Sequence, residues 1–168
     1  MKTFGVAAVA LVLALAVSAA GSARSTGKAF GVGCWVGKGV WNKTAHVGGT
    51  TVTFSKATFD FTVGVTKHSA GGTLAVKGHA TADNTAINAS GEMKVNGVLE
   101  LSGKPGAVKA DGSYHLSGVV ISSGVSVPLE LDVDASGPMT ITSVTKTTAT
   151  GSFNTEKWTA HRIKGSCA

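Results

Sequence analysis

Hydrophobic and polar positions alternate most strictly between residues 125 and 134. The apolar positions of this segment are Val125, Val127, Leu129, Leu131 and Val133. A period of two is that of a β-strand with one buried and one solvent-facing side, whereas an amphipathic helix needs apolar residues three and four positions apart. Pro128 has no N–H group for a strand ladder, so the sequence predicts that this strand lies at a sheet edge or carries a bulge.

Weaker alternation of the same kind predicts the other strands. Short segments rich in Gly, Asn, Asp, Ser and Pro separate them, and turns of that length join antiparallel neighbours. Asp111-Gly112 is a two-residue hairpin signal, and Ser136-Gly137-Pro138 is typical of a further turn. The other strands are predicted at residues 32–41, 50–55, 57–66, 73–81, 92–101, 113–121, 139–144, 148–153 and 156–164. Because no segment has helical periodicity, we expect an all-β fold, a single antiparallel β-barrel or closed β-sandwich of about nine strands.

The first residues have the pattern of a secretory signal peptide. Lys2 is the only charged residue before Arg24, residues 6–17 are apolar, and small residues follow them. The apolar run is about a dozen residues long, which is shorter than the roughly 20 that a membrane-spanning helix needs. We therefore expect a signal peptide at residues 1–23, a loose basic arm at 24–31 and a single all-β domain at 32–168. The mature protein would be secreted and extracellular, with no integral membrane span.

The chain has two cysteines, Cys34 and Cys167, close to the two ends of the expected mature protein. In an oxidising compartment such a pair is expected to form one disulfide. A disulfide requires the two Cα atoms to approach within about 7 Å, so the ends of the domain would meet in space. Such an arrangement is expected in a closed barrel or in a sandwich whose terminal strands are adjacent. The alternative to the disulfide is a free reactive thiol.

The net charge of +6 is concentrated near the start of the chain. After the expected signal peptide, five basic residues, Arg24, Lys28, Lys38, Lys43 and Lys56, precede the first acidic one. A basic face of this kind could contact an anionic surface polymer such as an acidic glycan or a wall polymer. Nucleic acid is not expected as a partner, because export would remove it and no recognition motif is present.

Aromatic residues also concentrate early in the chain. Trp35, Trp41, Phe54, Phe59 and Phe61 lie within residues 35–61, and Tyr114 is the only aromatic residue between Phe61 and Phe153. Beyond their role in a core, such residues could form the walls of a pocket for a small apolar ligand. The candidate ligand-binding residues are Trp35, Trp41, Phe61 and Arg162.

Arg162 is included because of a resemblance. Gly33-Cys34-Trp35 on the first predicted strand, with Arg162 on the last, resembles the arrangement in lipocalins, where an Arg from the final strand caps a Gly-x-Trp motif. The resemblance covers four residues, and the Thr-Asp-Tyr motif of that family is not present. It implies a barrel in which Trp35 and Arg162 stack at the closed end.

Motifs for catalysis or metal binding are incomplete. Residues 132–137 match the first half of a calcium loop, but Ser143 stands where the closing Glu is required. Glu130, Asp132 and Asp134 share one strand face and could supply the paired carboxylates of a glycosidase. The five histidines lack metal-ligand spacing, and Gly-x-Ser-x-Gly is absent. The sequence thus predicts no catalytic residue, metal or cofactor. It also contains glycosylation sequons at Asn42 and Asn88.

These observations favour an exported, monomeric, non-enzymatic binding or surface-interaction protein. Its partner would be a small apolar ligand inside a β-barrel or an anionic glycan or wall polymer. The alternatives are a secreted carbohydrate-active hydrolase that uses the strand carboxylates and a structural wall or coat protein.

Overall fold

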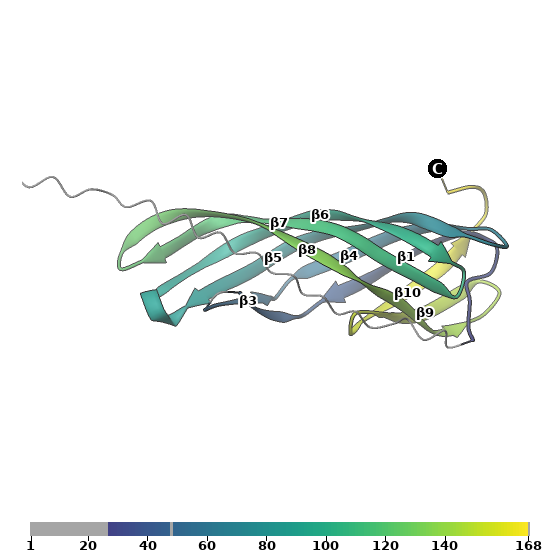
Figure 1. Ribbon diagram of the computed structural model, residues 1–168, viewed down its shortest axis with the longest axis horizontal. Helices are drawn as coiled ribbons and strands as arrows, with labels where there is room; N and C mark the ends of the chain where they lie inside the picture. Colours follow the sequence, from purple (N-terminus) through teal and green to yellow (C-terminus); the bar gives the residue numbers. More distant parts are fainter. Residues whose placement is uncertain (1–26, 48, 168) are drawn as a thin grey trace, which may run out of the picture.

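The computed structural model describes residues 27–47 and 49–167. The predicted signal peptide and Arg24 lie outside the described residues. The described chain forms ten strands and one 3-10 turn, η1, and the strands run lengthwise along an elongated molecule (Figure 1). The elements are β1 (Gly33–Trp41), β2 (Thr44–Val47), β3 (Thr50–Phe54), β4 (Ala57–Val65), β5 (Ala70–Asn84), η1 (Thr85–Ile87), β6 (Ala89–Lys104), β7 (Ala107–Ser122), β8 (Val125–Val144), β9 (Thr148–Phe153) and β10 (Glu156–Ile163).

The strands form one antiparallel sheet that closes on itself. Its order is β2-β3-β5-β4-β1-β10-β9-β8-β7-β6, and an additional pairing joins β5 to β6. This pairing makes a barrel-like ring of the eight strands from β5 through β1 and β8 to β6. β3 lies outside the ring order because it continues the line of β4 along β5, and β2 pairs with β3. The predicted all-β, closed, antiparallel fold is confirmed.

The ring is incomplete along part of β8. β7 pairs with this strand from Val125 to Met139, but β9 pairs with it only from Met139 to Val144. Within the described residues, β8 therefore has a neighbour on only one edge between residues 125 and 138. β2, at the end of the sheet order, likewise has one neighbour. The edge position predicted from Pro128 is confirmed.

The segment that precedes β1 closes the end of the ring that lies away from the unpaired part of β8. The backbone N–H of Phe30 donates a hydrogen bond to the carbonyl of Pro105 (3.0 Å), and Trp35 Nε1 donates to the carbonyl of Gly31 (2.7 Å). The Phe30 ring is 3% exposed and packs against Trp35 and Trp158, with centroids 5.4 and 5.7 Å away. Phe30 falls within the residues expected to form a loose arm, and it is part of the core.

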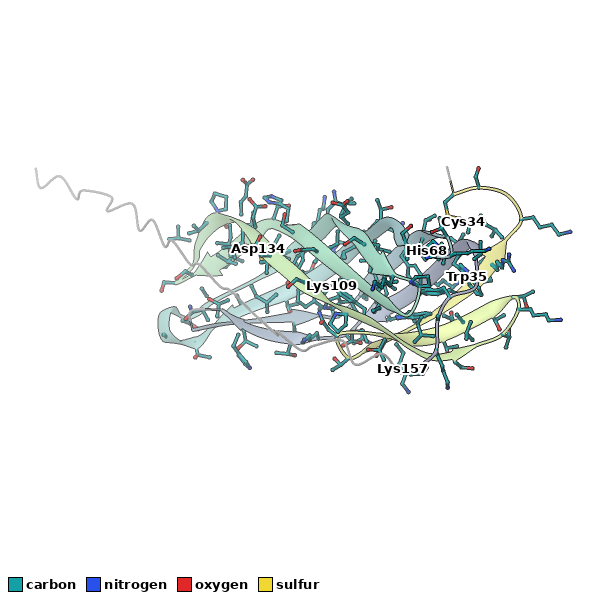
Figure 2. The ribbon with its side chains drawn as sticks, turned by 45° about the vertical axis from the view of Figure 1, so that its right-hand side comes forward. Cys34, Trp35, His68, Lys109, Asp134 and Lys157 are labelled. Carbon is teal, nitrogen blue, oxygen red and sulfur yellow. A yellow bond between two sulfur atoms is a disulfide. The ribbon has the colours of Figure 1, made fainter. Side chains whose placement is uncertain are left out.

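The predicted disulfide is confirmed. Cys34 and Cys167 are bonded, with their Cα atoms 5.2 Å apart across a sequence separation of 133 residues. The bond joins β1 to the tail that follows β10, at the end of the molecule where Figure 2 places Cys34 and Trp35. It fastens the segment after the last strand to the first strand.

Glycines on β1 allow aromatic side chains of β4 to fill the ring. A Cβ atom on Gly37 would lie 2.3 Å from Cζ of Phe61, and one on Gly39 would lie 2.3 Å from Cζ of Phe59. Both rings are almost fully buried. The glycine-rich first strand and the aromatic fourth strand are therefore complementary surfaces.

Two predicted turns are wrong. Asp111 and Gly112 lie within β7, and residues 136–138 lie within β8. Asp111 pairs with Glu100 of β6 and with Ser136 of β8, so strands flank it on both sides. Gly112 has φ of 155° and lets the backbone approach Leu99, to whose Cα an added Cβ would be 3.0 Å distant. A Cβ on Gly137 would likewise lie 2.1 Å from Oδ1 of Asn154, so both glycines serve close packing and not chain reversal.

Candidate functional site

A cleft of about 260 Å³ opens between the edge of β8 and the strand β2. Its apolar lining comes from β1, β3, β7 and β8, and consists of Trp41, Val52, Phe54, Tyr114, Leu116, Val133 and Ala135. Its polar lining consists of Lys43, Thr44, His46, Asp134, Ser136 and Asn154. The cleft exists because β9 does not extend along the edge of β8 before Met139. In Figure 2, Asp134 lies toward the end of the molecule opposite Cys34 and Trp35.

Aromatic contacts fix the inner wall of the cleft. The ring of Trp41 lies 5.9 Å from that of Tyr114 and 6.1 Å from that of Phe54, and the rings of Phe54 and Tyr114 are 5.8 Å apart. The Trp41–Tyr114 and Phe54–Tyr114 contacts are edge-to-face, a favourable geometry for aromatic pairs. The ring of Phe153, which does not line the cleft, lies 5.6 Å from that of Trp41. The wall is therefore held in place by packing on several strands.

Two polar groups belong to this apolar wall. Within the described residues, Trp41 Nε1 is a buried donor with no hydrogen-bond partner. Burial also raises the pKa of Tyr114 to about 12, because desolvation disfavours the phenolate. A buried donor without a partner costs about 1–3 kcal/mol, and this donor belongs to a residue that lines the cleft, so a ligand acceptor that reached it would remove this cost. The other such donor, Trp158 Nε1, belongs to a residue that does not line this cleft.

The four predicted ligand-binding residues do not form one site. Trp41 lines the cleft, whereas Trp35 and Phe61 are buried in the packed part of the ring and do not line it. Arg162 is exposed and is the cross-strand partner of Trp35; its side chain covers Gly33, on which a Cβ would lie 2.7 Å from Nε. Sequence reasoning missed Tyr114 and Val133 as cleft residues. The isolated position of Tyr114 among aliphatic strands was the available signal for the first.

The strand carboxylates lie on the outer face of β8. Glu130, Asp132 and Asp134 are exposed, and Asp132 Oδ1 lies 2.8 Å from Nδ1 of His115 on β7. Ser113 and Ser117 share this face, but within the described residues neither forms a hydrogen bond with His115. A nucleophilic serine needs that contact to its base. The described residues also contain no group of three or more His, Cys, Asp or Glu side chains placed to hold a metal ion.

The early lysines do not gather into one face. Lys28 donates a hydrogen bond to the carbonyl of Thr142 at the closed end, and Lys43 lines the cleft. Lys38 lies on the outside of β1 in a shallow groove that also contains Lys157, Asp60 and Glu156, and Lys56 lies between β3 and β4. They occupy four separate parts of the fold.

Both glycosylation sequons are accessible. Asn42 is exposed between β1 and β2, and Asn88 is exposed directly after η1, in the left-handed conformation with φ of 46°.

Comparison with models of protein families, with curated proteins and with solved structures finds no match to this chain. In the part of the chain that the structure describes, no helix has the length and apolar character needed to cross a membrane.

Proposed function

We propose that this protein is an exported, non-enzymatic binding protein that holds a small apolar molecule with one hydrogen-bond acceptor in the cleft between β2 and β8. The observation that carries the proposal is the buried Nε1 of Trp41, which within the described residues has no hydrogen-bond partner, in the aromatic wall of the cleft. A carbonyl or ether oxygen of the ligand would accept from this donor, and the apolar body would pack on Phe54, Tyr114 and Val133.

The dimensions of the cleft support a compact ligand. Its volume of about 260 Å³ is close to the lower end of the roughly 300–1,000 Å³ of small-molecule pockets. Export is supported by the disulfide, because such bonds persist in oxidising compartments. An anionic polymer partner has less support, since the lysines lie in separate parts of the fold. The hydrolase alternative has less support because Glu130 and Asp132 are exposed on the outer face of β8 and do not line the cleft.

A matched pair of probes tests the proposal. 2-Acetylnaphthalene and 2-isopropenylnaphthalene have similar size and shape, but only the ketone can accept a hydrogen bond. We expect the ketone to bind about tenfold more tightly, which corresponds to about 1.4 kcal/mol, because it alone satisfies the indole N–H. Quenching of tryptophan fluorescence during titration with each probe measures the two affinities.

Trp41→Phe removes the donor and should abolish the preference for the ketone. Trp158→Phe is the matched control, because it removes the other unpartnered indole donor outside the cleft and should leave the preference unchanged. Equal affinities of the two probes for the unaltered protein would contradict the proposal. So would a ketone preference that survives in Trp41→Phe.

A further inference from the structure

The longest unpaired strand edge in the described chain belongs to β8, between residues 125 and 138. β7 occupies one side of this segment, and β9 begins to pair with the other side only at Met139. An edge of this length presents a row of N–H and C=O groups to any extended segment that approaches it.

The hairpin that begins β8 shows which backbone groups face outward from the sheet. Ser122 pairs with Val125 across a two-residue loop in which Ser123 and Gly124 have φ of 49° and 80°, as in a type I′ turn. Residues that flank such a loop form a hydrogen-bonded pair, and pairing alternates from there along an antiparallel ladder. The odd-numbered residues of β8 therefore bond to β7, and the even-numbered residues direct their backbone groups to the free edge. Pro128 is even-numbered, so its missing N–H removes no bond to β7.

The side chains along this edge divide by charge and polarity between the two faces. On the outer face, Glu130, Asp132 and Asp134 are exposed, and Asp132 is the one of the three that pairs with a histidine. On the inner face, Val125 and Val127 are 63% and 43% exposed, and Leu129, Leu131 and Val133 are half-buried. The free edge is thus acidic on the outer face of the sheet and apolar on the inner face.

This division argues against a second copy of the chain as the occupant. Two β8 edges paired antiparallel about Asp132 would bring that carboxylate opposite its counterpart and Glu130 opposite Asp134. Like charges directly opposite one another on a sheet are destabilising. A strand with basic side chains on the outer face and apolar side chains on the inner face satisfies both faces at once.

We propose that the free edge of β8 is a docking site for an extended segment of a partner protein in which lysine or arginine alternates with apolar residues. The segment adds one strand to the sheet and bonds to the even-numbered residues of β8. It pairs its basic side chains with Glu130 and Asp134, and it covers the exposed valines and half-buried leucines of the inner face. The free edge shares Val133 and Asp134 with the lining of the cleft, so the two sites adjoin, but docking at the edge does not depend on a ligand in the cleft.

A peptide of roughly eight residues that alternates lysine and valine is the probe, and its binding is measured by the fluorescence anisotropy of a terminal dye. Two further versions carry N-methyl groups either on the lysine amides or on the valine amides. In an antiparallel addition only the lysine amides face β8, and in a parallel one only the valine amides do. We expect one methylated version to lose binding and the other to retain it, and the version that loses it reports the strand direction. Equal effects of both would overturn strand addition.

Charge reversal supplies the second arm. Replacing Glu130 and Asp134 together by Lys should weaken binding of the lysine peptide roughly tenfold and favour a peptide with glutamate in place of lysine. The matched control is Glu100→Lys, at an exposed outward position of β6 away from the free edge, which should change neither affinity. Unchanged peptide affinity after the double reversal would overturn the proposed charge pairing.

The remaining outcomes identify other occupants. Dimerisation in sedimentation velocity without peptide binding would assign the edge to a second copy and overturn the proposal. Binding to phosphatidylcholine vesicles without peptide binding would assign the exposed Val125 and Val127 to a lipid surface and would also overturn the proposal. Trp41→Phe should bind the peptide normally, so the result is read separately from the ketone titration of the cleft.

Discussion

The rings of Trp41 and Tyr114 meet at 62° with their centroids 5.9 Å apart, although β1 and β7 are not neighbours in the sheet. The contact therefore crosses the interior of the ring and does not follow the sheet. On one side of it the interior is filled by Phe59 and Phe153, and on the other side the cleft begins. This aromatic pair is the boundary between the packed core and the open part of the molecule.

The burial of Tyr114 has a direct spectroscopic consequence. Burial raises the pKa of Tyr114 from 10.0 to about 12 in the folded protein, so the folded state holds the phenol proton more tightly than the unfolded state does. The contribution of Tyr114 to the free energy of unfolding is therefore complete below about pH 10 and is lost as the pH rises toward 12. Tyr114 is the only tyrosine in the chain, so its ionisation can be followed by tyrosinate absorbance without interference from another tyrosine. We expect a titration midpoint near 12 in the folded protein and near 10 in denaturant. A midpoint near 10 in the folded protein would show that the hydroxyl is in water.

The disulfide should contribute strongly to stability, because it closes a loop across a sequence separation of 133 residues. In the chain-entropy description, a loop of this length corresponds to about 4–5 kcal/mol of unfolding free energy. Replacing Cys34 and Cys167 together by Ser should lower the denaturant midpoint and raise the slope, because the denatured chain without the cross-link is more expanded. Guanidinium titrations of the oxidised protein and the double variant measure the difference. A difference below about 1 kcal/mol would show that the denatured chain is already constrained at its ends.

The contact between β1 and β4 predicts a sharp contrast between two glycines. Gly37→Ala places a Cβ 2.3 Å from Cζ of Phe61 and 2.9 Å from the Cβ of Ala160, so overpacking should destabilise the protein by about 1–3 kcal/mol. Gly64→Ala is the control, because the nearest atom to its Cβ is 3.5 Å away. Thermal unfolding of the two variants compares them. Similar midpoints would mean that the Phe61 ring can move aside.

Phe30 tests whether the segment before β1 is a structural part of the ring. Its side chain is 3% exposed between Trp35 and Trp158, so Phe30→Ala should lower the unfolding free energy by about 3 kcal/mol. Val32→Ala, at a position that is 51% exposed, should have little effect. Chemical denaturation of both variants gives the comparison. An unaffected Phe30→Ala protein would make this segment an appendage and not a closure.

The alternation of side chains predicted most of the strands, because it reports which face of each strand is buried, but it did not predict β2. The closed fold was predicted from the short turns and from the two terminal cysteines. The alternation also contained evidence against the predicted hairpin at Asp111-Gly112. Two-residue loops place the residues on either side of them on the same face, which would bring Ala110 opposite Ser113. The apolar phase instead continues through Ala110, Tyr114 and Leu116, all of which are buried. Unbroken alternation of buried and exposed positions is therefore a stronger signal here than the Asp111-Gly112 pair. Gly112 reflects a close approach of the backbone to Leu99.

The cleft could be anticipated only in part. Trp41 was identified from its aromatic character, and Pro128 indicated an edge in the strand that borders the cleft. The position of the opening depends on the difference in length between β8 and β9, which no local pattern reports. Trp35 and Trp41 share one face of the same strand, yet only Trp41 lies where the ring is incomplete. Pairing partners decide this, and they are far away in the sequence.

The place of β1 in the sheet has a consequence for how the chain folds. β1 lies between β4 and β10, so one edge of the first strand has no partner until the last strand has been synthesised. Contacts of such large sequence separation slow folding, and ring closure is expected on a timescale of roughly milliseconds to seconds. During that interval β1 carries an open edge beside an aromatic strand, which is the kind of surface that holdase chaperones recognise. The nascent chain is therefore expected to be most prone to aggregation just before its final strand emerges.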